Sequence, residues 1–166
     1  MTTDAYARAR TALEPAHPGL IELSQRIYEN PELGYAEVQA AAWLTDALET
    51  AGHVVERGYG DMPTAFVATT GSGPLHVAIC AEYDALPAVG HACGHNVICT
   101  AAVGAAIALH SLADELGLKV SVIGTPAEEG GGGKIPFIEA GFFGDVHAAM
   151  MVHPFPADVA EPDIIA

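Results

Sequence analysis

Basic residues are scarce in this sequence of 166 residues. It contains 6 Lys and Arg against 21 Asp and Glu, which gives a formal net charge of −15. Nucleic acids and anionic lipid surfaces are bound through clustered Lys and Arg, so the composition argues against both kinds of partner. Charged residues make up only 16% of the chain and hydrophobic residues 51%, so we expect a buried core rather than wholesale disorder.

The sequence also lacks a leader segment and a long hydrophobic run. No basic stretch followed by an apolar one opens the chain, and the mostly apolar residues 101–109 are too few to span a bilayer. The three cysteines, Cys80, Cys93 and Cys99, are an odd number at irregular spacing, which is not typical of a disulfide framework. We therefore expect a cytoplasmic protein that forms one domain or a piece of a larger one.

Strands and helices are predicted to alternate along most of the chain. Apolar periodicity first predicts helices over residues 18–30 and 35–51. From residue 64 onwards the predicted order is β, β, α, β, α, β, which indicates an α/β sheet with helices on its faces. The predicted strands are residues 64–70, 75–81, 119–124 and 146–152, and the predicted helices among them are residues 96–116 and 135–140.

Chemically capable side chains follow three of these strands. Asp84 comes just after the second strand, Glu128 and Glu129 after the third, and His153 after the fourth. Ligands bind beyond the carboxyl ends of strands in open α/β sheets, so we expect these residues at one sheet edge. Asp84 could orient a metal ligand or hold a general base, or it could simply cap its own turn. A lone His is more often structural, but the position of His153 favours a ligand.

A second motif, His91-x-Cys93-x-His95, precedes the long predicted helix. In an extended loop this alternation would point three side chains the same way. Imidazole and thiolate are ligands for zinc and its neighbours in the transition series. A position ahead of a helix would also lower the pKa of Cys93 and favour its thiolate. The alternative is a loop cysteine with incidental histidines, against which the nearby carboxylates argue.

The adjacent carboxylates of Glu128 and Glu129 repel each other, so burying both requires a compensating cation or proton. With a metal ion present, one could be a ligand while the other takes a proton from the attacking water. An exposed acidic turn is the alternative, but four glycines follow the pair and favour a shaped loop. These glycines do not form a phosphate loop, because G-x-x-x-x-G-K-[ST] would need Gly at Glu128 and Ser or Thr at Ile135.

Taken together, the motifs resemble the aminoacylase/carboxypeptidase G-type metallopeptidases. Within this family they are most similar to the amidohydrolase branch that includes p-aminobenzoyl-glutamate hydrolases and a dipeptidase subgroup. The resemblance covers nearly the whole chain. The segments that carry it are IYENPELG (residues 27–34), EYDALP (82–87), GHACGHN (90–96) and GTPAEEGGGG (124–133).

This resemblance implies a hydrolase that uses one or two divalent metal ions, zinc or manganese, with cobalt also possible. The implied substrate is a small molecule, an N-acyl amino acid or a dipeptide, cleaved at its amide bond. By position, the implied metal ligands are Cys93, His95, Glu129 and His153, the implied general base is Glu128, and Asp84 would lie behind the metal site.

The sequence departs from the family pattern in two ways. Many relatives have Asp where Asn96 stands, and some have Asp or a ligating His where Glu82 stands, which leaves the number of occupied metal sites open. Family members are also more than twice as long, with an inserted lid and dimerisation domain. We therefore expect residues 1–166 to be the N-terminal part of a zinc-peptidase-like three-layer catalytic domain, with an incomplete mixed sheet, from a homodimeric parent.

Two other functions remain open at this point. One is a metal-binding relative without catalytic activity. The other is an amide hydrolase in which Cys93 is the nucleophile and His95 its partner. The intact Glu128-Glu129 pair favours metal-dependent hydrolysis, because thiol acyl transfer does not need it.

Overall fold

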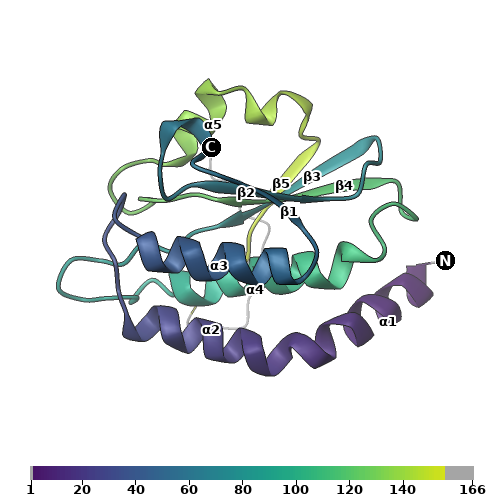
Figure 1. The fold of residues 1–166 in the computed structure, drawn as a ribbon, viewed down its shortest axis with the longest axis horizontal. Helices are drawn as coiled ribbons and strands as arrows, with labels where there is room; N and C mark the ends of the chain where they lie inside the picture. The colour runs from purple at the N-terminus through teal and green to yellow at the C-terminus, as the bar shows by residue number, and fades with distance from the viewer. Residues whose placement is uncertain (1, 156–166) are drawn as a thin grey trace.

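The computed structural model describes residues 2–155, which form a five-stranded mixed sheet with helices on both faces (Figure 1). The strand order is β1-β2-β4-β3-β5. β3, β4 and β5 are parallel, and β1 and β2 run antiparallel to their neighbours. The predicted α/β fold is confirmed. The strands are β1 Val54–Arg57, β2 Phe66–Thr70, β3 Leu75–Ala81, β4 Leu118–Gly124 and β5 Ala148–Met150.

The helices are distributed unevenly over the two faces. α3 and α4 lie against one face, α1 and α2 cover α4 from outside, and α5 lies on the opposite face (Figure 1). None of the helices between residues 2 and 155 is long and apolar enough to cross a membrane. The helices are α1 Thr2–Leu13, α2 His17–Glu29, α3 Val38–Thr50, α4 His95–His110 and α5 Lys134–Glu139.

Each face of the sheet has its own apolar core, as the alternation of side chains along a strand requires. On β3, Ile79 and Ala81 belong to the core under α3 and α4, whereas Ala78 and Cys80 belong to the core under α5. The aromatic rings of Phe137 and Phe142 fill the second core. This two-sided burial explains why β3 and β4 appear in the sequence as nearly continuous apolar runs.

The elements differ from the predicted ones mainly at their ends. The predicted helix over 96–116 ends at His110, and the buried Leu112 and Ala113 lie in a turn. The predicted strand over 146–152 shortens to β5, a sheet edge whose residues are exposed. α1 and β1 were not predicted, because α1 exposes most of its residues and β1 is a short edge strand with little apolar periodicity.

The sheet register places the candidate site. Ala81 at the end of β3 pairs with Gly124 at the end of β4, so both chains leave the sheet at the same level. Thr125 then donates its backbone N–H to the carbonyl oxygen of Ala81 at 2.8 Å. The residues that follow these two strands therefore start from neighbouring positions at one edge.

Candidate metal centre

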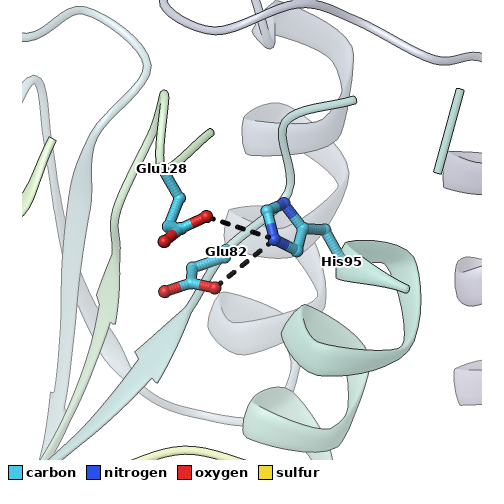
Figure 2. A group of neighbouring side chains, drawn as sticks. All are labelled: Glu82, His95 and Glu128. Atoms are coloured by element: carbon cyan, nitrogen blue, oxygen red, sulfur yellow. Dashed lines mark ion pairs between the residues drawn. The ribbon is translucent and has the colours of Figure 1, made fainter. Parts of the chain in front are cut away.

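Three side chains meet beyond the ends of β3 and β4: Glu82, His95 and Glu128 (Figure 2). The Nε2 atom of His95 lies 3.5 Å from Glu82 Oε2 and 3.7 Å from Glu128 Oε2. One potential ligand atom from each residue falls within 4.8 Å of the other two. Glu82 and His95 are buried, whereas 40% of the Glu128 side chain is exposed. The cluster is therefore closed on the protein side and open at Glu128.

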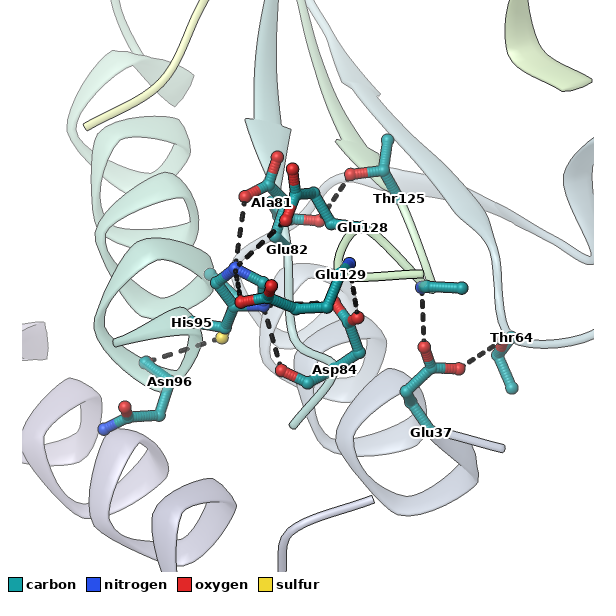
Figure 3. A network of polar contacts seen from close by, with 12 residues as sticks. Glu37, Thr64, Ala81, Glu82, Asp84, His95, Asn96, Thr125, Glu128 and Glu129 are labelled. Carbon is teal, nitrogen blue, oxygen red and sulfur yellow. Dashed lines mark hydrogen bonds and ion pairs between the residues drawn. The ribbon is translucent and has the colours of Figure 1, made fainter. Parts of the chain in front are cut away.

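Asp84 determines how His95 is oriented (Figure 3). The Nδ1 atom of His95 donates to Asp84 Oδ1 at 3.0 Å, and the backbone N–H of Glu129 donates to Asp84 Oδ2 at 3.0 Å. Burial alone would raise the pKa of Asp84, but these hydrogen bonds outweigh it and lower the pKa. Burial likewise opposes the charged form of His95, yet Asp84 and Glu82 raise its pKa. A carboxylate behind a histidine is the usual way in which proteins orient a metal-ligating imidazole.

Cys93 and Glu129 lie beside this cluster. Glu129 Oε1 is 3.8 Å from His95 Nε2, and the half-buried Cys93 thiol lies next to the Glu129 carboxylate. The Glu129 carboxylate, with burial and the other neighbouring carboxylates, raises the pKa of Cys93 to about 11. The predicted lowering of the Cys93 pKa is therefore wrong. The thiol faces carboxylates, whose negative charge outweighs the effect of the helix N-terminus.

The motif around Cys93 is not an extended loop. Residues 91–94 form a turn in which Gly94 N–H donates to the carbonyl oxygen of His91 at 3.1 Å, and Gly94 has a left-handed φ of 82°. His95 is the first residue of α4. The buried His91 lines a separate hollow with Tyr28 and Glu29. The extended arrangement predicted for the three residues is therefore wrong.

His153 follows β5, at the sheet edge where the sequence predicts it. It is exposed, and its Nδ1 atom donates to the carbonyl oxygen of Pro154 at 2.8 Å. Pro154 packs against Gly94, where an added Cβ would come 2.8 Å from Pro154 Cγ. The segment thus lies beside the Cys93 turn, while the His153 side chain is not a member of the compact group formed by Glu82, His95 and Glu128. Its role as a ligand stays a prediction.

A buried glutamate holds the loop that carries Glu128 and Glu129. Glu37, just before α3, accepts from the Ala127 backbone N–H at 2.8 Å and from the Thr64 hydroxyl at 3.0 Å (Figure 3). Ala127 has a φ of 55°, which is strained for a residue with a side chain. Burial raises the pKa of Glu37. Sequence reasoning missed this residue, because its partners are 27 and 90 residues away.

The glycine run after this loop is explained by close packing. An added Cβ would come 2.4 Å from the Tyr35 ring at Gly131 and 1.8 Å from the Pro126 carbonyl oxygen at Gly133. Tyr35 also donates its hydroxyl to the carbonyl oxygen of Gly131 at 2.7 Å. The run therefore folds the loop back on itself and delivers Lys134, the first residue of α5, to the site.

Sequence reasoning left Glu82 without a role. In the structure, one of its oxygens faces His95 and the other forms an ion pair with Lys134. The signal was its place directly after β3, where some relatives of the resembled family carry a ligand. Burial raises the pKa of Glu128, and the negative charge of Glu82 adds to this, while Lys134 and His95 oppose it. Glu128 is thus a carboxylate with an increased affinity for protons.

The donor set fits a divalent cation. Three carboxylates, those of Glu82, Glu128 and Glu129, approach His95 Nε2 within 3.5–3.8 Å. Carboxylates placed this close repel one another unless a cation or a proton compensates. Carboxylate oxygen, imidazole nitrogen and a cysteine sulfur together are ligands that divalent metal ions use in proteins. The site lies at the carboxyl ends of parallel strands, a common ligand position in α/β proteins.

A mixed α/β sheet with this donor set at its edge defines an α/β protein with a candidate metal site. A family profile described as "Peptidase family M20/M25/M40" matches residues 78–165, and the chain belongs to this family. The resemblance to metallopeptidases that the motifs indicate is thereby confirmed.

Two curated relatives illustrate the range of the family. The Xaa-Arg dipeptidase of Mus musculus is 44% identical over 178 residues, which cover 95% of this chain and 41% of the relative. One of the p-aminobenzoyl-glutamate hydrolase chains of Escherichia coli (strain K12) is 36% identical over 170 residues, which cover 91% of this chain and 35% of the relative. The chain therefore spans well under half the length of these proteins.

A solved structure supports the same assignment. The YXEP protein of Bacillus subtilis, described as a dinuclear metal binding peptidase from the M20 family, superposes with a TM-score of 0.74 at 29% identity. The match covers 82% of this chain and 42% of that protein. The described residues thus have the fold of part of an M20 peptidase.

Proposed function

We propose that this chain is the N-terminal part of the catalytic domain of a metal-dependent hydrolase that cleaves the amide bond of small N-acyl amino acids or dipeptides. The observation that carries the proposal is the meeting of Glu82, His95 and Glu128 at the sheet edge, with His95 held from behind by Asp84. The names of the relatives support the substrate class, since a dipeptidase and a p-aminobenzoyl-glutamate hydrolase both suggest small amides of amino acids.

The metal-holding residues in this proposal are the four that the motifs imply. His95, Glu129, Cys93 and His153 hold one or two divalent ions, zinc or manganese, with cobalt also possible, and Glu82 borders the same site. When bound, a divalent ion supplies positive charge that polarises the substrate carbonyl and increases the acidity of water. Asp84 keeps the Nδ1 proton of His95 directed away from the site, so that Nε2 presents its lone pair.

Glu128 is the general base in this proposal. It accepts a proton from the water that attacks the carbonyl carbon, and it returns the proton to the amine as the carbon–nitrogen bond breaks. Its raised pKa supports this role, because a base with a pKa nearer to neutral can both take and return the proton. The exposed side of Glu128 is also where a small substrate can enter.

The Cys93 nucleophile is the weaker alternative. A thiolate is the reactive form of cysteine, and a pKa of about 11 keeps Cys93 protonated at neutral pH unless a cation replaces the proton. The side chain that most affects it is the Glu129 carboxylate, which raises the thiol pKa, and not an activating imidazole. The other alternative, a metal-binding relative without catalytic activity, would bind metal in the same way and differ from the proposed hydrolase only in having no turnover.

The test is hydrolysis of a substrate panel by protein that includes the downstream reading frame. The panel contains Xaa-Arg dipeptides, other dipeptides, p-aminobenzoyl-glutamate and N-acetyl amino acids, with Zn²⁺ or Mn²⁺ added. We expect turnover that EDTA abolishes and added metal restores. Turnover that resists EDTA would identify thiol chemistry, and metal uptake without any turnover would identify a non-catalytic relative.

A further inference from the structure

The two carboxylate oxygens of Glu82 have different partners. Oε2 lies 3.5 Å from His95 Nε2 and belongs to the candidate metal cluster. Oε1 forms an ion pair with the ammonium group of Lys134. The Glu82 side chain is only 3% exposed and that of Lys134 35%. A carboxylate this deeply buried needs a counter-charge, and within the described residues Lys134 is the permanently charged group that contacts it, beside the titratable ring of His95.

The packing of the glycine run brings Lys134 to this position. Gly133 abuts the carbonyl oxygen of Pro126, which leaves no room for a Cβ, and α5 starts at the next residue. A cation at the first residue of a helix is disfavoured by the helix dipole, so helix formation does not account for the lysine. Glu128 and Lys134 also line one small hollow of about 150 Å³.

We propose that Lys134 is a positioning residue that controls metal binding: its ammonium group holds Glu82 in an ion pair and so prevents this carboxylate from ligating a divalent ion at the site. The inference rests on the metal site of the proposed function. A divalent ion and an ammonium group compete for the same carboxylate, because each neutralises it at short range. In the absence of metal, Lys134 is the counter-charge that stabilises buried Glu82.

The first test is calorimetric titration of Co²⁺ into metal-free wild-type protein and K134M. With the ammonium group removed, Glu82 becomes free to ligate, and we expect affinity for Co²⁺ to rise about tenfold or more. The visible spectrum of bound Co²⁺ should change, because an oxygen ligand is added. K134R, which keeps the charge, should resemble the wild type, and K134Q should resemble K134M.

Lys119 provides a matched control. Its side chain is 36% exposed and pairs with Asp145 at 3.2 Å. K119M removes the same charge from the same chain without touching Glu82, so the affinity for Co²⁺ should stay within about threefold of wild type. An equal gain in K119M and K134M would overturn the proposal, since it would show a general effect of net charge.

A double variant tests whether Lys134 acts through Glu82. In the E82Q background the carboxylate that Lys134 holds is gone, so K134M should increase the affinity for Co²⁺ by no more than about threefold. A full gain in this background would contradict the proposed route.

Thermal melting gives a second readout. Metal-free K134M should melt below wild type because buried Glu82 loses its partner, and Co²⁺ should raise its melting temperature more than that of wild type.

The outcomes separate this inference from the proposed function. If wild-type protein takes up neither Co²⁺ nor Mn²⁺, the metal site of the proposed function is wrong. If wild type binds Co²⁺ and K134M and K134Q bind it equally well with the same spectrum, only the role of Lys134 is wrong.

Discussion

At the scale of single residues, the site is organised by the two ring nitrogens of His95. Nδ1 is fixed by Asp84 at 3.0 Å, whereas Nε2 faces carboxylates at 3.5–3.8 Å. A hydrogen bond to one nitrogen selects the tautomer and leaves the other nitrogen free to bind a cation. We therefore propose that Asp84 influences metal binding without being a ligand itself.

We expect D84N to weaken metal binding. The amide can accept only one of the two hydrogen bonds that the carboxylate accepts, from His95 Nδ1 and the Glu129 N–H. Loss of such an orienting partner lowers metal affinity by about 10–100-fold. Titration of Zn²⁺ into metal-free protein measures the change, with D46N, at an exposed carboxylate, as the control. Unchanged affinity in D84N would show that Asp84 does not orient His95.

Stability should depend on pH through buried histidines outside the site. His53 is 5% exposed, and burial together with the charge of His110 lowers its pKa. In the unfolded chain this histidine takes up a proton near pH 6.5, whereas in the folded chain it stays neutral at that pH. Its contribution to the stability of the fold is therefore fully present above this pH and is lost as the pH falls below it.

Urea unfolding between pH 7.5 and 5.5 measures this dependence. One such histidine contributes at most about 1.4 kcal/mol per pH unit. H53Q should flatten the profile, whereas H17Q, at an exposed histidine, should leave it unchanged. A profile that stays equally steep in H53Q would exclude His53 as a cause.

At the scale of elements, the loop between β4 and α5 determines the geometry of the site. It carries Glu128 and Glu129 and places Lys134, while Glu37 anchors its strained Ala127. Glycines at positions 131 and 133 allow the loop to pack against Tyr35 and Pro126. The loop is thus held from both sides rather than being a free acidic turn.

Two glycines of this loop form a matched pair for mutation. A Cβ at Gly133 would come 1.8 Å from the Pro126 carbonyl oxygen, whereas at Gly130 it would meet no atom within 4 Å. G133A should lower the free energy of unfolding by about 1–3 kcal/mol, as overpacking does. G130A should change it by less than about 0.5 kcal/mol. Chemical denaturation of both variants measures these changes. Equal losses of unfolding free energy in G133A and G130A would contradict the packing role of Gly133.

We expect the stability of the fold to depend on the hydrogen bonds that Glu37 accepts rather than on its negative charge. E37A leaves the buried Ala127 N–H and Thr64 hydroxyl without an acceptor, at a cost of about 1–3 kcal/mol for each unsatisfied group. E37Q retains one oxygen for Ala127, and the Thr64 hydroxyl can turn to accept from the amide. Urea unfolding should therefore rank E37Q between wild type and E37A. An E37Q variant as unstable as E37A would show that the charge itself is needed.

The sequence predicts the central elements well and the long-range contacts poorly. β3 has the predicted bounds, because its apolar run ends abruptly at Glu82. The edge strand β1 and the Glu37 anchor could not be predicted, since their partners are distant in the chain. The Cys93 pKa was predicted with the wrong sign because the sequence does not show which carboxylates face the thiol.

At the scale of the whole molecule, the net charge of −15 and the carboxylates of the site both favour the binding of cations. A negative surface potential concentrates cations near the protein, and the carboxylates at the sheet edge then offer them donors. The motifs correctly indicated the M20 family and the sheet edge at which the site lies. They could not show that Glu82 and Lys134 are paired there, because 52 residues separate them.

In the proposed mechanism, Glu128 moves protons and Glu129 holds metal. E128Q and E129Q, made in protein that includes the downstream reading frame, test it when metal content and turnover are measured on both. We predict that E128Q keeps its metal and loses about a hundredfold or more of kcat, while E129Q loses metal affinity. Equal metal loss in both variants, or an E128Q variant with ordinary turnover, would contradict this division of roles.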